Sequence, residues 1–198
     1  MTLRIALTGS IGMGKSTVAA MFERAGIPLF DADAEVRKLQ GPGGALVGAI
    51  GKRFPGSVRD GAVDREALSG QVLGKPEELA ALEAIVHPGV HAARAQFLLA
   101  HRDAPAIIFD IPLLFETGGQ DAFDKVIVVS APSRIQRARV LARPGMTAEK
   151  LDAILARQTP DEEKRAQADF VVDTGGDLST TERQVAEILA CLGLSPGR

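Results

Sequence analysis

Residues 9–17 of the chain read GSIGMGKST, and this short stretch decides what kind of fold the sequence can form. Before it lies an apolar run, residues 3–8, with the composition of a buried β-strand. After it, from about residue 15 to residue 25, the pattern predicts an α-helix that Gly26 ends. The sequence therefore predicts a strand, a glycine-rich turn and a helix in direct succession.

The spacing of glycine, lysine and serine in this turn matches the P-loop pattern. Glycines let backbone N–H groups turn toward phosphate oxygens without steric cost, and the helix N-terminus favours negative charge. Lys15 would reach the β- and γ-phosphates, and Ser16 would present its hydroxyl to Mg²⁺. A chance glycine turn capped by a helix would not require this full spacing. The residues expected to bind the nucleotide are Gly12, Met13, Gly14, Lys15, Ser16 and Thr17.

Composition excludes several classes of protein. The chain has 198 residues, a net charge of −2 and neither Trp nor Tyr, which disfavours a general nucleic-acid binder. Its single cysteine excludes an intramolecular disulfide and a multi-cysteine zinc site. No apolar run approaches the ~20 residues that span a bilayer, and no signal peptide is visible. The sequence contains no Asn, so it lacks the Asn-Lys-x-Asp motif by which GTPase switches read guanine. We expect a cytoplasmic protein that binds neither nucleic acid nor membrane.

Strand-like and helix-like segments alternate along most of the chain. This alternation predicts an α/β fold, a parallel sheet covered by helices on both faces. The segment 45–101 contains no convincing strand and reads as several helices, with Pro88 breaking or starting one of them. A capping box at 179–182 is expected to open the closing helix. The expected strands are 3–8, 27–31, 106–110, 125–130 and 169–172, and the expected helices include 34–40, 132–143 and one from about 147.

Acidic residues follow two of the expected strands. Ligands bind at the carboxyl ends of the strands of an open parallel sheet. Asp31 and Asp33 lie at the end of one strand and Asp110 at the end of another. Phosphoryl transfer uses one carboxylate to orient the acceptor hydroxyl and another to hold Mg²⁺. Asp33 also fits as the N-cap of the next helix, and Asp110 fits equally well as a Mg²⁺–water contact or as a solvated residue.

The expected helix 132–143 carries four arginines and no acid. Cations of this kind can close over a transferring phosphoryl group, although a solvated basic face is an equally good interpretation. Gln136, Arg139 and Arg143 share one face of this helix. The four arginines are Arg134, Arg137, Arg139 and Arg143.

Two other features invite a functional interpretation. His87 and His91 have the i, i+4 spacing of a metal pair, but no third ligand is evident, which favours a structural or substrate-contacting histidine. Cys191 lies in the apolar closing helix and is predicted to be a small buried residue.

Several motifs, in their order along nearly the whole chain, resemble the dephospho-coenzyme A kinases. DIPLLFE is the most discriminating of these motifs. They are LTGSIGMGKST (7–17), FDAD (30–33), Gly61-x-x-Asp64-Arg65-x-x-Leu68, His87-Pro88-x-Val90, DIPLLFE (110–116), Gln136-x-x-Arg139-x-x-x-Arg143, Gln158 and Arg165-x-x-Ala168-Asp169.

The resemblance implies transfer of phosphate from ATP to the ribose 3′-hydroxyl of dephospho-coenzyme A, the final step of coenzyme A synthesis. It implies a monomer with a three-layer P-loop core around a five-stranded parallel sheet (1–33, 104–133 and 168–198), a helical substrate-binding insert (34–103) and a lid (134–160). The catalytic residues implied are Asp33 as general base, Lys15, and the lid residues Arg139 and Arg143. The substrate contacts implied are Asp33, Arg65, His87, Leu113 and Glu116, and the Mg²⁺ ligands are Ser16 and Asp31.

The sequence departs from the family pattern at two places. Pro55 follows Phe54 where the family often has glycine, and Thr174 stands where it often has Asn, which affects the loop expected near adenine. Two other functions fit the P-loop. A nucleoside or nucleoside monophosphate kinase would prefer a short acceptor. An ATP-bound switch would show no acceptor-dependent ADP release.

Overall fold

The computed structural model describes residues 2–194 and divides into two compact units. One unit contains the chain up to Phe30 and from His101 onward, and the other contains Asp31–Ala100. The second unit begins and ends three residues earlier than the insert expected at 34–103.

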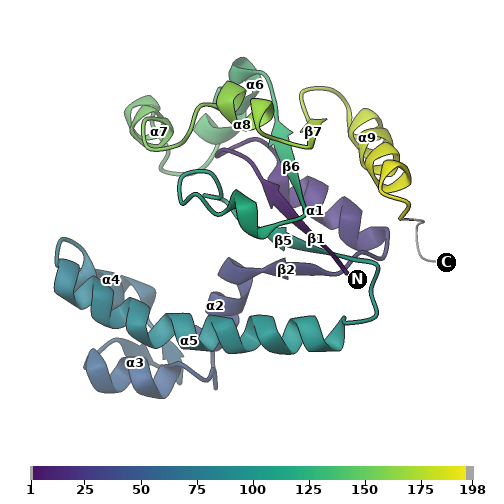
Figure 1. Ribbon diagram of the computed structural model, residues 1–198. Helices are drawn as coiled ribbons and strands as arrows, with labels where there is room; N and C mark the ends of the chain where they lie inside the picture. Colours follow the sequence, from purple (N-terminus) through teal and green to yellow (C-terminus); the bar gives the residue numbers. More distant parts are fainter. Residues whose placement is uncertain (1, 195–198) are drawn as a thin grey trace. The chain divides into compact units, whose positions relative to one another are not determined.

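The first unit is built on a five-stranded sheet of order β2-β5-β1-β6-β7 (Figure 1). Strand β1 pairs in parallel with both β5 and β6, and β7 pairs in parallel with β6. The expected parallel sheet is thereby confirmed. Strand β2 is shorter than expected, although the Ile108 N–H still donates to the Pro28 carbonyl beside it, at 2.8 Å. The strands are β1 (Leu3–Thr8), β2 (Leu29–Asp31), β5 (Ala106–Asp110), β6 (Lys125–Ser130) and β7 (Phe170–Asp173).

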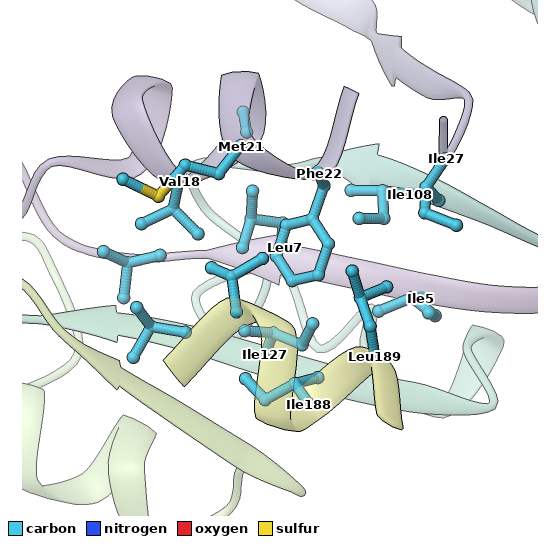
Figure 2. Close-up of a cluster of buried hydrophobic side chains, with 14 of the residues drawn as sticks. Ile5, Leu7, Val18, Met21, Phe22, Ile27, Ile108, Ile127, Ile188 and Leu189 are labelled. Atoms are coloured by element: carbon cyan, nitrogen blue, oxygen red, sulfur yellow. The ribbon is translucent and has the colours of Figure 1, made fainter. Parts of the chain in front are cut away.

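Alternate residues of the strands enter two apolar clusters, one on each face of the sheet. Ile5 and Leu7 of β1 join the larger cluster with α1 (Lys15–Arg24) and α9 (Leu178–Cys191) (Figure 2). Ala6, between them, joins the smaller cluster. This alternation follows from the two-residue period of a strand. Because both faces are covered, the strands are apolar throughout and their carboxyl ends are left for ligands.

The remaining helices of this unit follow β6. They are α6 (Ser133–Leu141), α7 (Ala148–Leu155) and α8 (Asp161–Ala166), and a short 3₁₀ helix (Gln120–Ala122) precedes β6. Thr147 caps α7, as its position predicts. Two expectations are wrong. Helix α9 is capped by Asp177, which accepts the Thr180 N–H at 2.7 Å, so the helix begins before residue 179. Cys191 is exposed, although Ile188 and Leu189 of the same helix are buried in the larger cluster.

The second unit is mainly helical, and it differs from the sequence-based expectations in two ways. Pro88 lies inside α5 and does not break it, because residues on its N-terminal side (Leu82, Ile85 and Val86) pack on the unit's core. A small hairpin of β3 and β4 is present where no strand was expected. Its turn is Asp60-Gly61, both with positive φ, which is a strong hairpin signal. The elements are α2 (Ala32–Gln40), α3 (Val47–Arg53), β3 (Val58–Arg59), β4 (Ala62–Val63), α4 (Arg65–Val72) and α5 (Pro76–Ala100).

This second unit has an apolar cluster of its own. Ile50 and Phe54 are its most deeply buried members, and Leu46, Val63, Leu68 and Val72 complete it. None of the helices in residues 2–194 is both long and apolar enough to cross a membrane.

Candidate active site

The P-loop connects β1 to α1 in a conformation that requires glycine. Gly12 and Gly14 have φ values of 79° and 87°, in the left-handed region that other residues rarely adopt. A Cβ atom on Gly12 would also lie 2.4 Å from Val140 Cγ2 of α6. The loop is therefore packed closely against α6, and it lines one side of a cavity of about 410 Å³. The cavity is lined by Gly9–Thr17 together with Pro112, Arg143 and Gln158.

Lys15 and Asp110 form an ion pair at the carboxyl end of the sheet. Their side chains are only 17% and 8% exposed, so the pair is shielded from solvent. Asp110 is therefore not a solvated residue, and this alternative is excluded. The pair places a carboxylate beside the lysine that is expected to bind phosphate, while Ser16 lies exposed at the cavity.

Two glutamines hold the peptide groups of Ile11. The Ile11 N–H donates to Gln158 Oε1 at 3.2 Å, and Gln136 Nε2 donates to the Ile11 carbonyl at 2.8 Å. Gln136 belongs to α6 and Gln158 follows α7, so both ends of the expected lid contact the P-loop. Gln136 is buried where α6 contacts the P-loop.

Arg139 is bound to the loop that follows β7. Its guanidinium donates to Thr174 Oγ1 at 2.9 Å and to the Thr174 carbonyl at 2.7 Å. The Thr174 hydroxyl in turn donates to the Met13 carbonyl of the P-loop at 2.7 Å. Arg139 and Thr174 line a second cavity, of about 360 Å³, which shares Gly12, Gly14, Thr17 and Arg143 with the first. Arg143 thus borders both cavities, whereas Arg139 borders only the one away from Lys15.

Glu116 takes part in a buried ion pair. Its Oε1 lies 2.7 Å from the Nζ of Lys164, which has no exposed surface, and it accepts the Thr159 N–H at 2.9 Å. Burial raises the pKa of Glu116, but Lys164 and the Thr159 N–H favour the ionised form more strongly, and the net pKa is lowered. Glu116 is therefore a carboxylate at neutral pH.

The acids at the end of β2 belong to the second unit. Asp31 caps α2, since its Oδ1 accepts the Ala34 N–H at 2.8 Å, and Oδ2 lies 3.5 Å from Arg37. The N-cap is therefore Asp31 and not Asp33, because α2 begins two residues earlier than expected. Asp33 lies exposed in the first turn of α2 and is free of the capping role.

The other expected substrate contacts are exposed. Arg65 is the first residue of α4, and His87 lies within α5. Leu113, which follows β5, is 46% exposed, as suits a residue that contacts a ligand. Residues 2–194 contain no cluster of three or more His, Cys, Asp or Glu side chains fit to hold a metal, so His87 and His91 form no such site.

The sequence does not predict a place in this region for three of its residues. Lys164 is a buried cation in a short, highly charged helix, and its sequence context gives no sign of burial. In the sequence Thr174 is marked only by its departure from the family pattern, and Gln158 only by its agreement with that pattern. The hydrogen bonds of all three depend on tertiary placement, which spacing along the chain does not reveal.

The sheet order and the P-loop between β1 and α1 together define a P-loop nucleotide-binding protein. A family model for dephospho-CoA kinase matches residues 3–180. A dephospho-CoA kinase of Novosphingobium aromaticivorans is 54% identical over 94% of this chain and 92% of its own length. The chain belongs to the dephospho-CoA kinase family.

Solved structures share this fold. The Thermus thermophilus protein TT1252 is 38% identical with a TM-score of 0.80, over 96% of this chain and 98% of its own. A dephospho-CoA kinase from Campylobacter jejuni shares the fold, with a TM-score of 0.67 at 24% identity over 99% of each chain. The similarity extends over both units.

Proposed function

We propose that this protein transfers the γ-phosphoryl group of ATP to the ribose 3′-hydroxyl of dephospho-coenzyme A, giving coenzyme A and ADP. The observation that carries the proposal is the cavity lined by the P-loop, into which the loop contributes Lys15 and the expected lid contributes Arg143. Backbone N–H groups, one lysine and one arginine are donors suited to triphosphate oxygens. Family membership specifies the acceptor.

Lys15 acts on the phosphates, and Asp110 keeps it in place until they arrive. When ATP binds, its phosphate oxygens compete with Asp110 for the ammonium group, so Lys15 exchanges one anionic partner for another. Arg143, which borders both cavities, is placed to neutralise charge that develops on the transferring group. Arg139, bound to Thr174, is assigned to the nucleotide rather than to the transferring phosphoryl group.

Mg²⁺ enters this proposal as a companion of ATP. It supplies charge neutralisation at the phosphates and usually takes few protein ligands. The Ser16 hydroxyl and the Asp110 carboxylate are oxygen ligands that could hold it beside the P-loop. We assign the carboxylate role to Asp110 rather than to Asp31, because Asp31 uses its oxygens within α2.

Asp33 is proposed as the general base for the 3′-hydroxyl. A general base needs a carboxylate that is accessible to the acceptor, and Asp33 is exposed while its neighbour Asp31 provides the helix cap. Arg65, His87 and Leu113 are proposed to contact dephospho-coenzyme A. We also propose that the protein acts as a cytoplasmic monomer, for which its one free thiol fits a reducing compartment.

The deciding experiment is an ADP-release assay with Mg-ATP, in which dephospho-coenzyme A, AMP, CMP and adenosine are compared as acceptors. We expect turnover with dephospho-coenzyme A and a product that comigrates with coenzyme A. Preference for CMP or AMP would replace the proposal by a nucleoside monophosphate kinase. Tight ATP binding without turnover on any acceptor would indicate a switch. Light scattering of the protein as it elutes from a size-exclusion column measures the oligomeric state.

A further inference from the structure

Lys164 and Glu116 depend on each other inside the first unit. Lys164 has no exposed surface, and its Nζ lies 2.7 Å from Glu116 Oε1. The side chain of Glu116 is 12% exposed. A buried charge without its partner is strongly unfavourable, because neither protein dipoles nor water compensate for its lost hydration. Neither side chain can therefore leave the pair without leaving a charge uncompensated.

The same carboxylate fixes the end of the expected lid. Glu116 Oε1 accepts the Thr159 N–H at 2.9 Å, and the preceding residue, Gln158, accepts the Ile11 N–H at 3.2 Å. Glu116 thus holds the backbone one residue away from a side chain that contacts the P-loop. Since Gln158 also lines the P-loop cavity, a displacement at Thr159 would be transmitted to the nucleotide site.

Both carboxylate oxygens of Glu116 are poorly placed for a ligand. Oε1 already faces two donors, and Oε2 is buried without a hydrogen-bond partner among residues 2–194. A substrate group that reached either oxygen would have to open the ion pair. We propose that Glu116 is a positioning residue that holds Thr159 and Gln158 against the P-loop and so sets the affinity for ATP, without touching dephospho-coenzyme A. This role replaces the substrate contact that the family resemblance implies.

This positioning role rests on the proposed function only where the KM for dephospho-coenzyme A is measured. The variants are E116Q, which leaves Lys164 unpaired, and E116Q/K164M, which removes both charges while the introduced amide can still accept the Thr159 N–H. The readouts are the equilibrium affinity for a non-hydrolysable ATP analogue and the KM for dephospho-coenzyme A. We expect E116Q to lose about tenfold in analogue affinity, with the KM for dephospho-coenzyme A changed by less than about twofold. The double variant should regain wild-type affinity.

A matched control exists in the same unit. Lys125 pairs with Asp169 at the same Nζ–O distance, 2.7 Å, so K125M breaks an ion pair away from the P-loop and should leave both constants unchanged. The proposal is overturned if E116Q binds the analogue as wild type does. It is also overturned if the double variant keeps analogue affinity but raises the KM for dephospho-coenzyme A tenfold.

If E116Q does not fold, the double variant decides between the two roles by itself, because it contains no unpaired buried charge at this position. Analogue binding needs no acceptor. A wild-type protein inert toward dephospho-coenzyme A would therefore overturn the proposed function, while the binding comparison would still test the positioning role.

Discussion

Lys15 is paired with Asp110, and the proposed function gives it phosphate as a second partner. Both side chains of this ion pair are shielded from solvent. The lysine contributes nothing to the apolar clusters, which contain other residues of β1 and α1. Its loss should therefore affect binding and transfer of phosphate far more than folding.

We expect Lys15→Ala to lower turnover by at least about 100-fold, the usual effect of removing one charge-stabilising donor. The circular dichroism spectrum should stay that of the folded protein. Steady-state kinetics and circular dichroism together check this. Because Asp110 would be left without its lysine, Lys15→Met/Asp110→Asn serves as the control for any loss of stability. Unfolding of both Lys15→Ala and this control would contradict the prediction, whereas unfolding of Lys15→Ala alone would trace the loss to the unpaired Asp110.

The neighbouring carboxylates Asp31 and Asp33 should separate into a structural and a chemical role. Asp33→Asn is expected to lower kcat by about 10²–10⁴-fold, the range of general-base catalysis, without a matching loss of ATP affinity. Asp31→Ala should instead lower the free energy of unfolding by about 1 kcal/mol through loss of the helix cap. Steady-state kinetics of both variants measure kcat, and urea denaturation measures their free energies of unfolding. An equal loss of ATP affinity in Asp33→Asn would mark Asp33 as a metal ligand or a structural residue.

Individual elements could be predicted from the sequence to different degrees. Strands β1, β5 and β6 were located with their correct ends, because an uninterrupted apolar run is a local property. The P-loop and the helix after it could also be predicted, since the spacing of the glycines encodes the turn. The β3–β4 hairpin was missed although Asp60-Gly61 signals it, because strands of two residues have no visible period. Helix α5 was interrupted in the prediction at Pro88, whose cost is offset by packing that only the fold reveals.

The candidate site divides in the same way. Its glycines, Lys15 and the aspartates at strand ends follow from local patterns and from the topology of parallel sheets. The network of Met13, Thr174 and Arg139 joins the P-loop, the segment after β7 and α6, which are far apart along the chain. No local pattern predicts such a contact, and the exposure of Cys191 was missed for the same reason: the buried side of α9 depends on how the helix docks.

Thr174 should be needed for the connection between α6 and the P-loop. In Thr174→Val the Met13 carbonyl and Arg139 both lose a hydroxyl partner without a change in side-chain shape. We expect the free energy of unfolding to fall by about 1–3 kcal/mol and the KM for ATP to rise. Urea denaturation and initial rates measure these effects. Thr174→Ser, which keeps the hydroxyl, should recover both. A Thr174→Val protein with wild-type values would show that this hydroxyl is dispensable.

The ion pair between Glu116, after β5, and Lys164 of α8 should make the stability of the fold depend on pH in the acidic range. Because the pKa of Glu116 is lowered in the folded protein, its stabilisation is complete above the ordinary glutamate pKa of about 4.3. It is lost as the pH falls through the lowered value. The Tm of the wild type should therefore fall over this acidic range more steeply than that of E116Q/K164M. Scanning calorimetry at several pH values compares the two slopes, and parallel slopes would contradict the assignment.

At the scale of the whole molecule, the two units share no apolar cluster among the residues that the structure describes. The larger unit carries the sheet and the P-loop, and Asp31–Ala100 is held by the cluster around Ile50 and Phe54. The candidate base belongs to one unit and the phosphate loop to the other. We therefore expect turnover to depend on the fold of the second unit, and ATP binding to depend only on that of the larger one.

Ile50→Ala tests this division. A cavity at this fully buried position should destabilise its unit by about 2–5 kcal/mol, so amides within residues 31–100 should lose protection from hydrogen exchange first. ATP-analogue affinity should stay near the wild-type value while turnover falls. Ile127→Ala, at an equally buried position of β6, is the matched substitution and should reduce analogue binding. Uniform loss of protection along the chain in Ile50→Ala would show that the two clusters unfold as one.

The exposed position of Cys191 has a practical consequence. It is the chain's one cysteine and lies near the end of α9. A maleimide dye would therefore attach at a single known point and give homogeneous labelled samples without mutagenesis. The same thiol lets two molecules become covalently linked when air oxidises them. A dimer seen without reductant would then be a product of storage, and dithiothreitol would abolish it.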